Sequence, residues 1–342
     1  MNRRFASTTS SSRLLGVAFV VVLLLLVASV VERKQLEAEL QNAKFIAKVY
    51  PLAPSDDEIR FPRRILSIDE PYIFVGGVPR SGTTLMRAML DAHSLIRCGG
   101  ETMMLPQFLQ WQSGWRGDKW MNGSGITPEV LDLAVSAFIS EIVAKHDKMA
   151  ERLCNKDPYT ALWLPTLRRL FPNARFILMI RDARAVVHSM VEREVPVGGY
   201  NRSDPPQMFR KWNQEITKML FQCGNAPGLC LQVFYERLVQ KPREEIGRIL
   251  EFLDVPFDEN VLRHHQLIGD EIDLSDQEFS ASQVKKALNV DALTAWFDCF
   301  SNETLAEVND LAPMLSLLGY DTKSTTPSYE RFAGDDFHRG HF

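Results

Sequence analysis

The sequence lacks a surplus of positive charge: 39 lysines and arginines stand against 43 aspartates and glutamates, which gives a net charge of −4. General nucleic-acid binding requires a basic face, so we expect no nucleic-acid partner. Any anion must instead be bound by local arginines and lysines. Internal repeats are absent as well. With 45% hydrophobic and 24% charged residues, the chain has the composition of a globular domain and not of a disordered protein.

Long uncharged hydrophobic runs are also scarce, and the one that stands out covers residues 14–31. This run is just long enough to span a bilayer as a helix. Because Arg3, Arg4 and Arg13 precede it, the positive-inside rule places residues 1–13 in the cytosol and the bulk of the chain in the lumen. A cleaved signal peptide is the alternative, although the run exceeds the usual apolar segment of such a peptide.

The rest of the chain divides by composition. Residues 32–68 are expected to be a stem and linker, helical or simply polar at first and then rich in proline. Residues 69–321 form the folded domain, in which apolar strands alternate with helices. This alternation predicts an α/β fold with a parallel central sheet flanked by helices. Residues 322–342 are expected to be a disordered tail.

A phosphate-binding loop is present, but it lacks its lysine. The segment YIFVGGVPRSGTT (72–84) places Gly77 and Gly82 as in the P-loop pattern, with Thr83 where lysine belongs. That lysine normally reaches the β- and γ-phosphates of a nucleoside triphosphate. A loop without it fits a nucleotide whose single 5′-phosphate carries a small charged group better than ATP. A tight strand–helix turn without a ligand is the alternative interpretation.

A second anion site is predicted at IRDARAVVHSMVER, residues 180–193. Arg181 ends an apolar strand, and Ser189 and Arg193 follow on the next helix. An arginine fork with a hydroxyl suits a phosphate. An arginine at the end of a strand is often merely solvated or paired. Because ligands of parallel sheets bind at the carboxyl ends of the strands, two anion sites there describe a nucleotide with 5′- and 3′-phosphates.

The chain has only five cysteines. The simplest pairing in an oxidising compartment joins Cys98 to Cys154 and Cys223 to Cys230, and leaves Cys299 free. The sequence does not exclude other pairings. Three N-glycosylation sequons support a lumenal location, each of them weakly, and they lie at Asn122, Asn201 and Asn302.

Seven segments together resemble the tyrosylprotein sulfotransferases, over about residues 70–321. They are VPRSGTTLMRAMLDAH, CGGET, CNKDP, RDARAVVHSM, VFYERLV, the LIG…LS element at 267–275 and APMLSLLGYD. The resemblance implies a P-loop-like sulfotransferase fold and a type II protein of the Golgi membrane. It also implies a homodimer that transfers the sulfuryl group of 3′-phosphoadenosine 5′-phosphosulfate (PAPS) to tyrosines of secretory and membrane proteins.

The resemblance also implies a role for each matching residue. Glu101 would be the general base, and Arg80, Lys156 and Ser280 would stabilise the transferring sulfuryl group. The 5′-phosphosulfate would be held by Arg80, Ser81, Gly82, Thr83 and Thr84, and the 3′-phosphate by Arg181, Ser189 and Arg193. The other donor contacts would be Tyr235, Ser280, Lys286 and Asn289. Because the leaving group is already stable, the chemistry requires no metal.

The acceptor side departs from the family pattern. Thr102, Met103 and Gln107 follow the glutamate at the expected peptide-binding positions, but the enzymes that the chain resembles carry arginines where Met103 and Gln107 stand. This puts the usual preference for acidic flanking residues in doubt, with Arg116 and Lys119 as candidates to replace the lost charge. The alternatives for the whole chain are a carbohydrate sulfotransferase, a catalytically inactive binding protein and a P-loop kinase.

Overall fold

The computed structural model describes residues 33–34, 66–145, 150–269, 271–274, 278–288 and 290–337. The predicted cytosolic tail and membrane span (1–31), nearly all of the predicted stem, and Asn289 lie outside these residues. Among the residues that the structure describes, no helix is long and apolar enough to cross a bilayer.

Five parallel strands form one sheet, in the order β2-β3-β1-β4-β5. They are β1 (Ile73–Gly77), β2 (Ile96–Arg97), β3 (Arg152–Lys156), β4 (Arg175–Ile180) and β5 (Cys230–Phe234). Val75 pairs with Lys156 on one side and with Ile177 on the other, so the residues that follow β1, β3 and β4 meet at one edge. The predicted α/β fold with a parallel sheet is confirmed.

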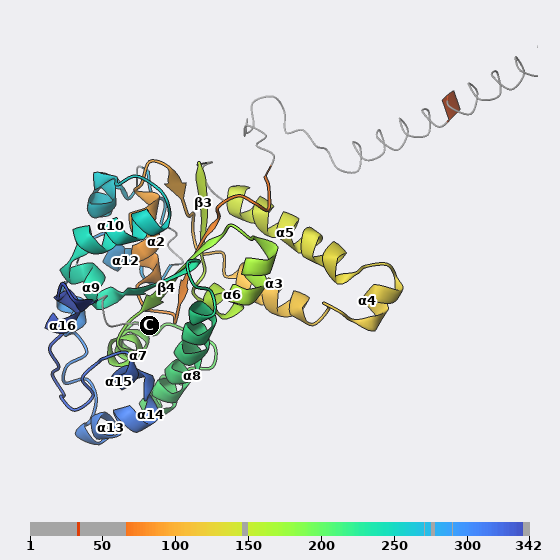
Figure 1. Ribbon diagram of the computed structural model, residues 1–342. Coiled ribbons are helices and arrows are strands. Elements are labelled where there is room, and N and C mark those ends of the chain that lie inside the picture. Colours follow the sequence, from red (N-terminus) through yellow and green to blue (C-terminus); the bar gives the residue numbers. More distant parts are fainter. Residues whose placement is uncertain are drawn as a thin grey trace, which may run out of the picture. The chain divides into compact units, whose positions relative to one another are not determined.

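Helices cover both faces of this sheet (Figure 1). The longer helices are α2 (Thr83–Asp91), α3 (Met104–Ser113), α5 (Pro128–Lys145), α7 (Ala183–Glu192), α8 (Pro205–Gly224) and α10 (Pro242–Phe252). The shorter ones are α4 (Lys119–Gly123), α6 (Leu164–Leu170), α9 (Tyr235–Gln240), α11 (His264–Leu267), α12 (Ala281–Val284), α13 (Asn302–Ala306), α14 (Val308–Leu311), α15 (Met314–Leu317) and α16 (Glu330–Ala333). Three 3₁₀ turns also lie in the described part of the chain: Pro158–Trp163, Glu259–Arg263 and Val290–Leu293.

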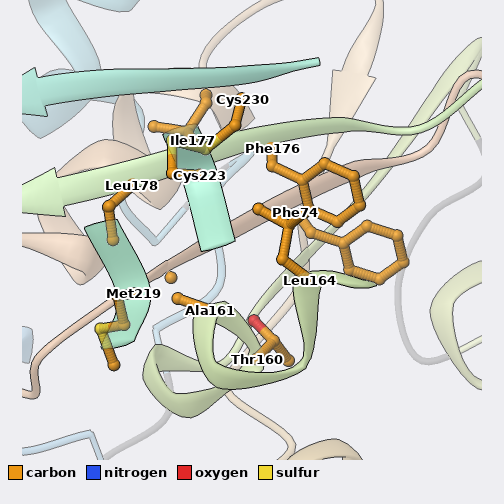
Figure 2. Close-up of a pocket in the computed structure, with 11 residues that line it drawn as sticks. Phe74, Thr160, Ala161, Leu164, Phe176, Ile177, Leu178, Met219, Cys223 and Cys230 are labelled. Carbon is orange, nitrogen blue, oxygen red and sulfur yellow. A yellow bond between two sulfur atoms is a disulfide. The ribbon is translucent and has the colours of Figure 1, made fainter. Parts of the chain in front are cut away.

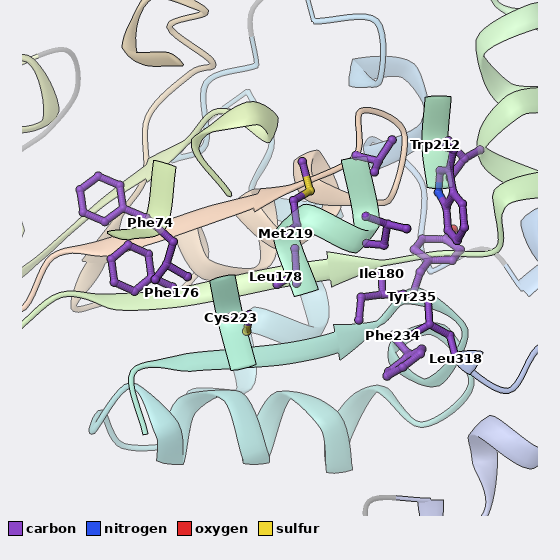
Figure 3. Packing of buried hydrophobic residues seen from close by; sticks show 14 of the residues in the cluster. Phe74, Phe176, Leu178, Ile180, Trp212, Met219, Cys223, Phe234, Tyr235 and Leu318 are labelled. Atoms are coloured by element: carbon purple, nitrogen blue, oxygen red, sulfur yellow. The ribbon is translucent and has the colours of Figure 1, made fainter. Parts of the chain in front are cut away.

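The side chains of the central strands alternate between two hydrophobic clusters. Phe74, Phe176 and Leu178 point toward the cluster that contains α6 and α8, where Trp212 and Met219 of α8 also pack (Figure 3). Their neighbours along β1 and β4 point toward α2 and α10 on the opposite face. This period of two is typical of a strand buried on both faces.

A small internal space lies inside the first cluster. Figure 2 shows it between the side chains of Phe74, Ala161 and Met219, beside the disulfide that joins Cys223 to Cys230. Its volume is about 10 Å³, which is about enough for one water molecule, and its lining is mostly apolar. The space is therefore a packing gap and not a ligand site.

The prediction of a disordered tail from residue 322 is wrong for residues 322–337. Tyr329, Phe332 and Phe337 are buried, and the rings of Phe332 and Phe337 lie 5.6 and 5.1 Å from the ring of Phe234. The Tyr329 hydroxyl also donates to Asp182 Oδ2 at 2.8 Å. The polar composition of the tail concealed these aromatic anchors, whose burial offsets the entropic cost of ordering the segment.

Candidate functional site

The phosphate loop connects β1 to α2. Gly82 has φ +98°, and a Cβ on it would lie 2.6 Å from Cδ2 of Tyr235, so only glycine fits there. Thr83 and Thr84 open α2 and are buried, and no side chain of the described residues caps this helix. Its first N–H groups and its dipole are therefore available to an anion.

Arg80 stands at the tip of this loop with φ +75°. Its guanidinium donates to Ser189 Oγ at 3.0 Å, to Ser280 Oγ at 2.5 Å and to Gln283 Oε1 at 2.8 Å. Burial, and next the positive charges of Arg181 and Arg193, lower the pKa of Arg80 to about 10. Such a crowding of cations is stabilised by an anion between them.

Arg181 follows β4 and closes the other side of this cluster. It donates to the carbonyl of Arg80 at 3.1 Å and to that of Ala292 at 2.9 Å, and its guanidinium lies 4.3 Å from the centre of the Tyr235 ring. The Nε atoms of Arg181 and Arg193 are buried, and neither finds a hydrogen-bond partner in the described part of the chain. Buried N–H donors without a partner are suited to bind the oxygens of a phosphate.

These groups open onto a cavity of about 350 Å³, which we call the donor cavity. Its charged lining residues are all cations, namely Arg80, Arg181, Arg193 and Lys286. Val284, Ala287 and Leu288 give it an apolar wall suited to a nucleobase. Of the predicted donor residues, Ser81 and Ser189 are buried behind this lining, and Asn289 is not among the described residues.

A second cavity, of about 300 Å³, lies on the other side of Arg80. We call it the acceptor cavity, and it contains Glu101 together with Met103, Gln107, Tyr159 and Phe279. Four residues line both cavities: Arg80, Thr83, Thr84 and Ser280. These four residues form a wall common to the two cavities, which we call the shared wall.

Lys156 ends β3, is fully buried and does not itself line the acceptor cavity, but it contacts three residues that do. Its Nζ lies 2.5 Å from Glu101 Oε2, 3.4 Å from Glu278 Oε2 and 3.5 Å from Thr84 Oγ1. The predicted base and the predicted catalytic lysine are therefore an ion pair beside the shared wall.

Glu278 is a residue that sequence reasoning missed. Its Oε1 accepts from the backbone N–H of Glu101 at 3.2 Å and lies 3.5 Å from Nη1 of the buried Arg87. It thereby fixes both Glu101 and Lys156. Its position two residues before Ser280 was the available signal, but a glutamate in a polar loop is usually solvated.

Asp157 was also missed, although it belongs to the CNKDP segment. Its carboxylate accepts from the Thr102 hydroxyl at 2.6 Å, from the N–H of Met103 at 2.7 Å and from the Asn155 amide at 3.0 Å. Burial raises the pKa of Asp157. Thr102, expected at the peptide, therefore holds the loop of Glu101 through Asp157 and does not line the acceptor cavity.

Both predicted disulfides are present, Cys98–Cys154 and Cys223–Cys230, and Cys299 is free and exposed. The first bridge joins the segment of Glu101 to the strand of Lys156. The three sequon asparagines Asn122, Asn201 and Asn302 are exposed. No group of three or more histidine, cysteine, aspartate or glutamate side chains that could hold a metal occurs in the described ranges.

A sequence profile of the sulfotransferase family matches residues 71–259. A putative protein-tyrosine sulfotransferase of Caenorhabditis elegans is 69% identical over 254 residues, which cover 74% of this chain and 98% of that protein. Protein-tyrosine sulfotransferase 1 of Homo sapiens is 45% identical over 268 residues, covering 76% of this chain and 72% of the human protein.

Among solved structures, the sulfotransferase domain from the curacin biosynthetic pathway superposes with a TM-score of 0.51 at 24% identity, covering 73% of this chain and 98% of that domain. This likeness shows the fold alone. The identities to the curated relatives are high enough to show the family itself. On these grounds the chain belongs to the protein-tyrosine sulfotransferases, a family of transferases.

Proposed function

We propose that this protein transfers the sulfuryl group of PAPS to tyrosine hydroxyls of secretory and membrane proteins. The observation that carries the proposal is the wall of Arg80, Thr83, Thr84 and Ser280. It separates a cavity whose described charged lining residues are all cations from one lined by Glu101, the carboxylate that pairs with the buried Lys156. A donor phosphosulfate on one side and an acceptor hydroxyl on the other would meet at this wall.

The donor cavity offers two anion sites. The start of α2 with Arg80 suits the 5′-phosphosulfate, and Arg181 with Arg193 suits the 3′-phosphate. Gly82 lets the Tyr235 ring pack directly against the loop. The positive charge that a P-loop lysine supplies comes instead from Arg80 and Lys156.

Glu101 is the base in this proposal. A tyrosine hydroxyl is a weak nucleophile at neutral pH, so its proton must leave as the new oxygen–sulfur bond forms. The Glu101 carboxylate accepts that proton. The bond between sulfur and the 5′-phosphate oxygen breaks at the same time, and adenosine 3′,5′-bisphosphate leaves with the electron pair.

Arg80, Lys156 and Ser280 stabilise the charge that develops on the sulfuryl and phosphate oxygens. Lys156 is bonded to Glu101 in the structure and also has Glu278 within 3.4 Å. When Glu101 takes up a proton and loses its charge, Glu278 keeps a negative charge beside Lys156. The lysine is thus held near the shared wall throughout the reaction.

We further propose that the protein is a single-span type II protein of the Golgi membrane, glycosylated and homodimeric. The uncharged run at 14–31, the arginines before it, the two disulfides and the exposed sequons support this proposal. Protease protection and glycosidase digestion of the full chain in microsomes test the orientation, and analytical ultracentrifugation tests the dimer. If the chain carried no glycan and protease added outside the intact microsomes digested its folded domain, the proposed topology would be contradicted.

The reaction is tested by incubating the purified full chain with ³⁵S-labelled PAPS and three acceptors. These are a tyrosine peptide, the same peptide with phenylalanine in place of tyrosine, and a heparan-type glycan. We expect label in the tyrosine peptide alone. Label in the glycan would identify a carbohydrate sulfotransferase, and donor binding without any labelled product would identify an inactive binding protein.

A further inference from the structure

The acceptor cavity differs sharply from the donor cavity in charge. Its lining contains three carboxylates, from Glu101, Asp157 and Glu278, and Arg80 is the only cation among its described lining residues. The guanidinium of Arg80 already donates to Ser189, Ser280 and Gln283 and faces the donor cavity as well. No cation of this lining is therefore left to bind an acidic side chain of an acceptor.

The mouth of the acceptor cavity is instead apolar and uncharged. Met103 is 63% exposed and Phe279 is 52% exposed, and both line the cavity. Gln107, also exposed, donates its amide to the Met103 carbonyl at 3.0 Å, which fixes this rim. Val195, Pro196, Val197 and Gly198 also line this cavity. Exposed apolar side chains around a concave site are typical of surfaces that bury a partner.

The two cations that the sequence offers as substitutes do not reach this mouth. Arg116 Nε lies 3.3 Å from Asp132 Oδ1 of α5 and forms an ion pair with it. Lys119 begins α4, which lies at the far end of α3 and α5 (Figure 1). Neither residue lines the acceptor cavity.

We propose that the acceptor site selects tyrosines whose neighbours in sequence are uncharged and apolar, and that Met103 and Phe279 are the side chains that contact those neighbours. This inference rests on the proposed function. An acidic neighbour would lose part of its hydration against Met103 and Phe279 and would find no unengaged cation in the described lining, which is unfavourable. An apolar neighbour would bury the exposed surfaces of Met103 and Phe279, which is favourable.

The test is a pair of matched peptides with one central tyrosine, flanked by aspartate and glutamate in the first and by leucine and alanine in the second. We expect the full chain to sulfate the apolar peptide with a kcat/KM about tenfold higher. The variant Met103→Arg/Gln107→Arg should reverse this preference, and the reversal should weaken as salt is added. The uncharged control Met103→Gln/Gln107→Met should not favour the acidic peptide.

Binding provides a second measurement that does not depend on turnover. Phenylalanine versions of both peptides, titrated by calorimetry in the presence of adenosine 3′,5′-bisphosphate, should show the same order of affinity. Faster sulfation of the acidic peptide by the unmodified chain would overturn this inference and leave the proposed function intact. Bisphosphate binding with no sulfation of either peptide would overturn the proposed function itself.

Discussion

The donor and acceptor cavities share a wall but differ in the charged residues that line them. The donor cavity is lined by four cations and, in the described residues, by no carboxylate, whereas the acceptor cavity is lined by three carboxylates and one arginine. The first is built to hold a fixed anion, and the second to remove a proton. The unit formed by β1, the phosphate loop and α2 serves both tasks, because Arg80 of this loop lines both cavities.

If the comparison is correct, removing the base should affect transfer alone. We expect Glu101→Gln to lower the rate of transfer by about 10³-fold, within the range for loss of general base catalysis. The affinity for adenosine 3′,5′-bisphosphate should change less than about twofold, because Glu101 does not line the donor cavity. Single-turnover assays and calorimetry measure the two effects. A comparable loss of donor affinity would break the comparison.

Removing a donor-cavity cation should have the opposite effect. Arg181→Ala should weaken bisphosphate binding by about 1.5–3 kcal/mol, the usual contribution of hydrogen bonds to a charged group. Arg243→Ala is the matched control, because Arg243 is exposed and pairs with Glu259 away from both cavities. Equal affinity of Arg181→Ala and the unmodified chain would refute the assignment of Arg181 to the 3′-phosphate.

A smaller effect is expected at Glu278. The variant Glu278→Gln keeps the shape of the side chain but removes the charge near Lys156 and Arg87, and we expect kcat to fall by about tenfold with little change in donor affinity. A purely structural role would instead lower the melting temperature and leave kcat unchanged at temperatures where the protein is folded. Thermal unfolding and kcat, measured on the same preparation, separate the two.

The smallest effect concerns Glu236, beneath the donor cavity. Burial raises the pKa of its carboxyl to about 7, while the N–H of Asp182 and the hydroxyl of Tyr320 both donate to it at 2.9 Å. A carboxyl with a raised pKa in the folded state favours folding at low pH, and this contribution is lost as the pH rises through 7. Glu236→Gln should flatten the stability profile between pH 5 and 8. A profile parallel to that of the unmodified chain would contradict this assignment.

Much of this fold was predictable from the sequence, because strands β1, β4 and β5 are mostly apolar. The short strands β2 and β3 were missed, since Arg152–Lys156 is polar in sequence and is buried only because α5 and the sheet enclose it. Helix α8 was missed as well. Its buried residues Trp212, Ile216 and Met219 recur at spacings of four and three, so the local pattern does indicate a helix here.

The site was predicted unevenly, for a related reason. Arg80 and Arg181 were found because each follows a predicted strand, and Glu101 and Lys156 because their segments resemble a known family. Glu278 and Asp157 were not assigned roles, because their importance lies in contacts between distant segments. Residues 278 and 101 are in contact although 177 positions separate them in the sequence, and spacing along the sequence does not reveal such a contact.

The central claim is that donor and acceptor occupy adjacent cavities of one chain at the same time. The most direct test is native mass spectrometry of the Glu101→Gln variant, which should bind both ligands without turnover, mixed with adenosine 3′,5′-bisphosphate and an apolar tyrosine peptide. We predict a complex that contains one bisphosphate and one peptide per chain. Displacement of the peptide by the bisphosphate would show that the two compete for one cavity and would contradict the account.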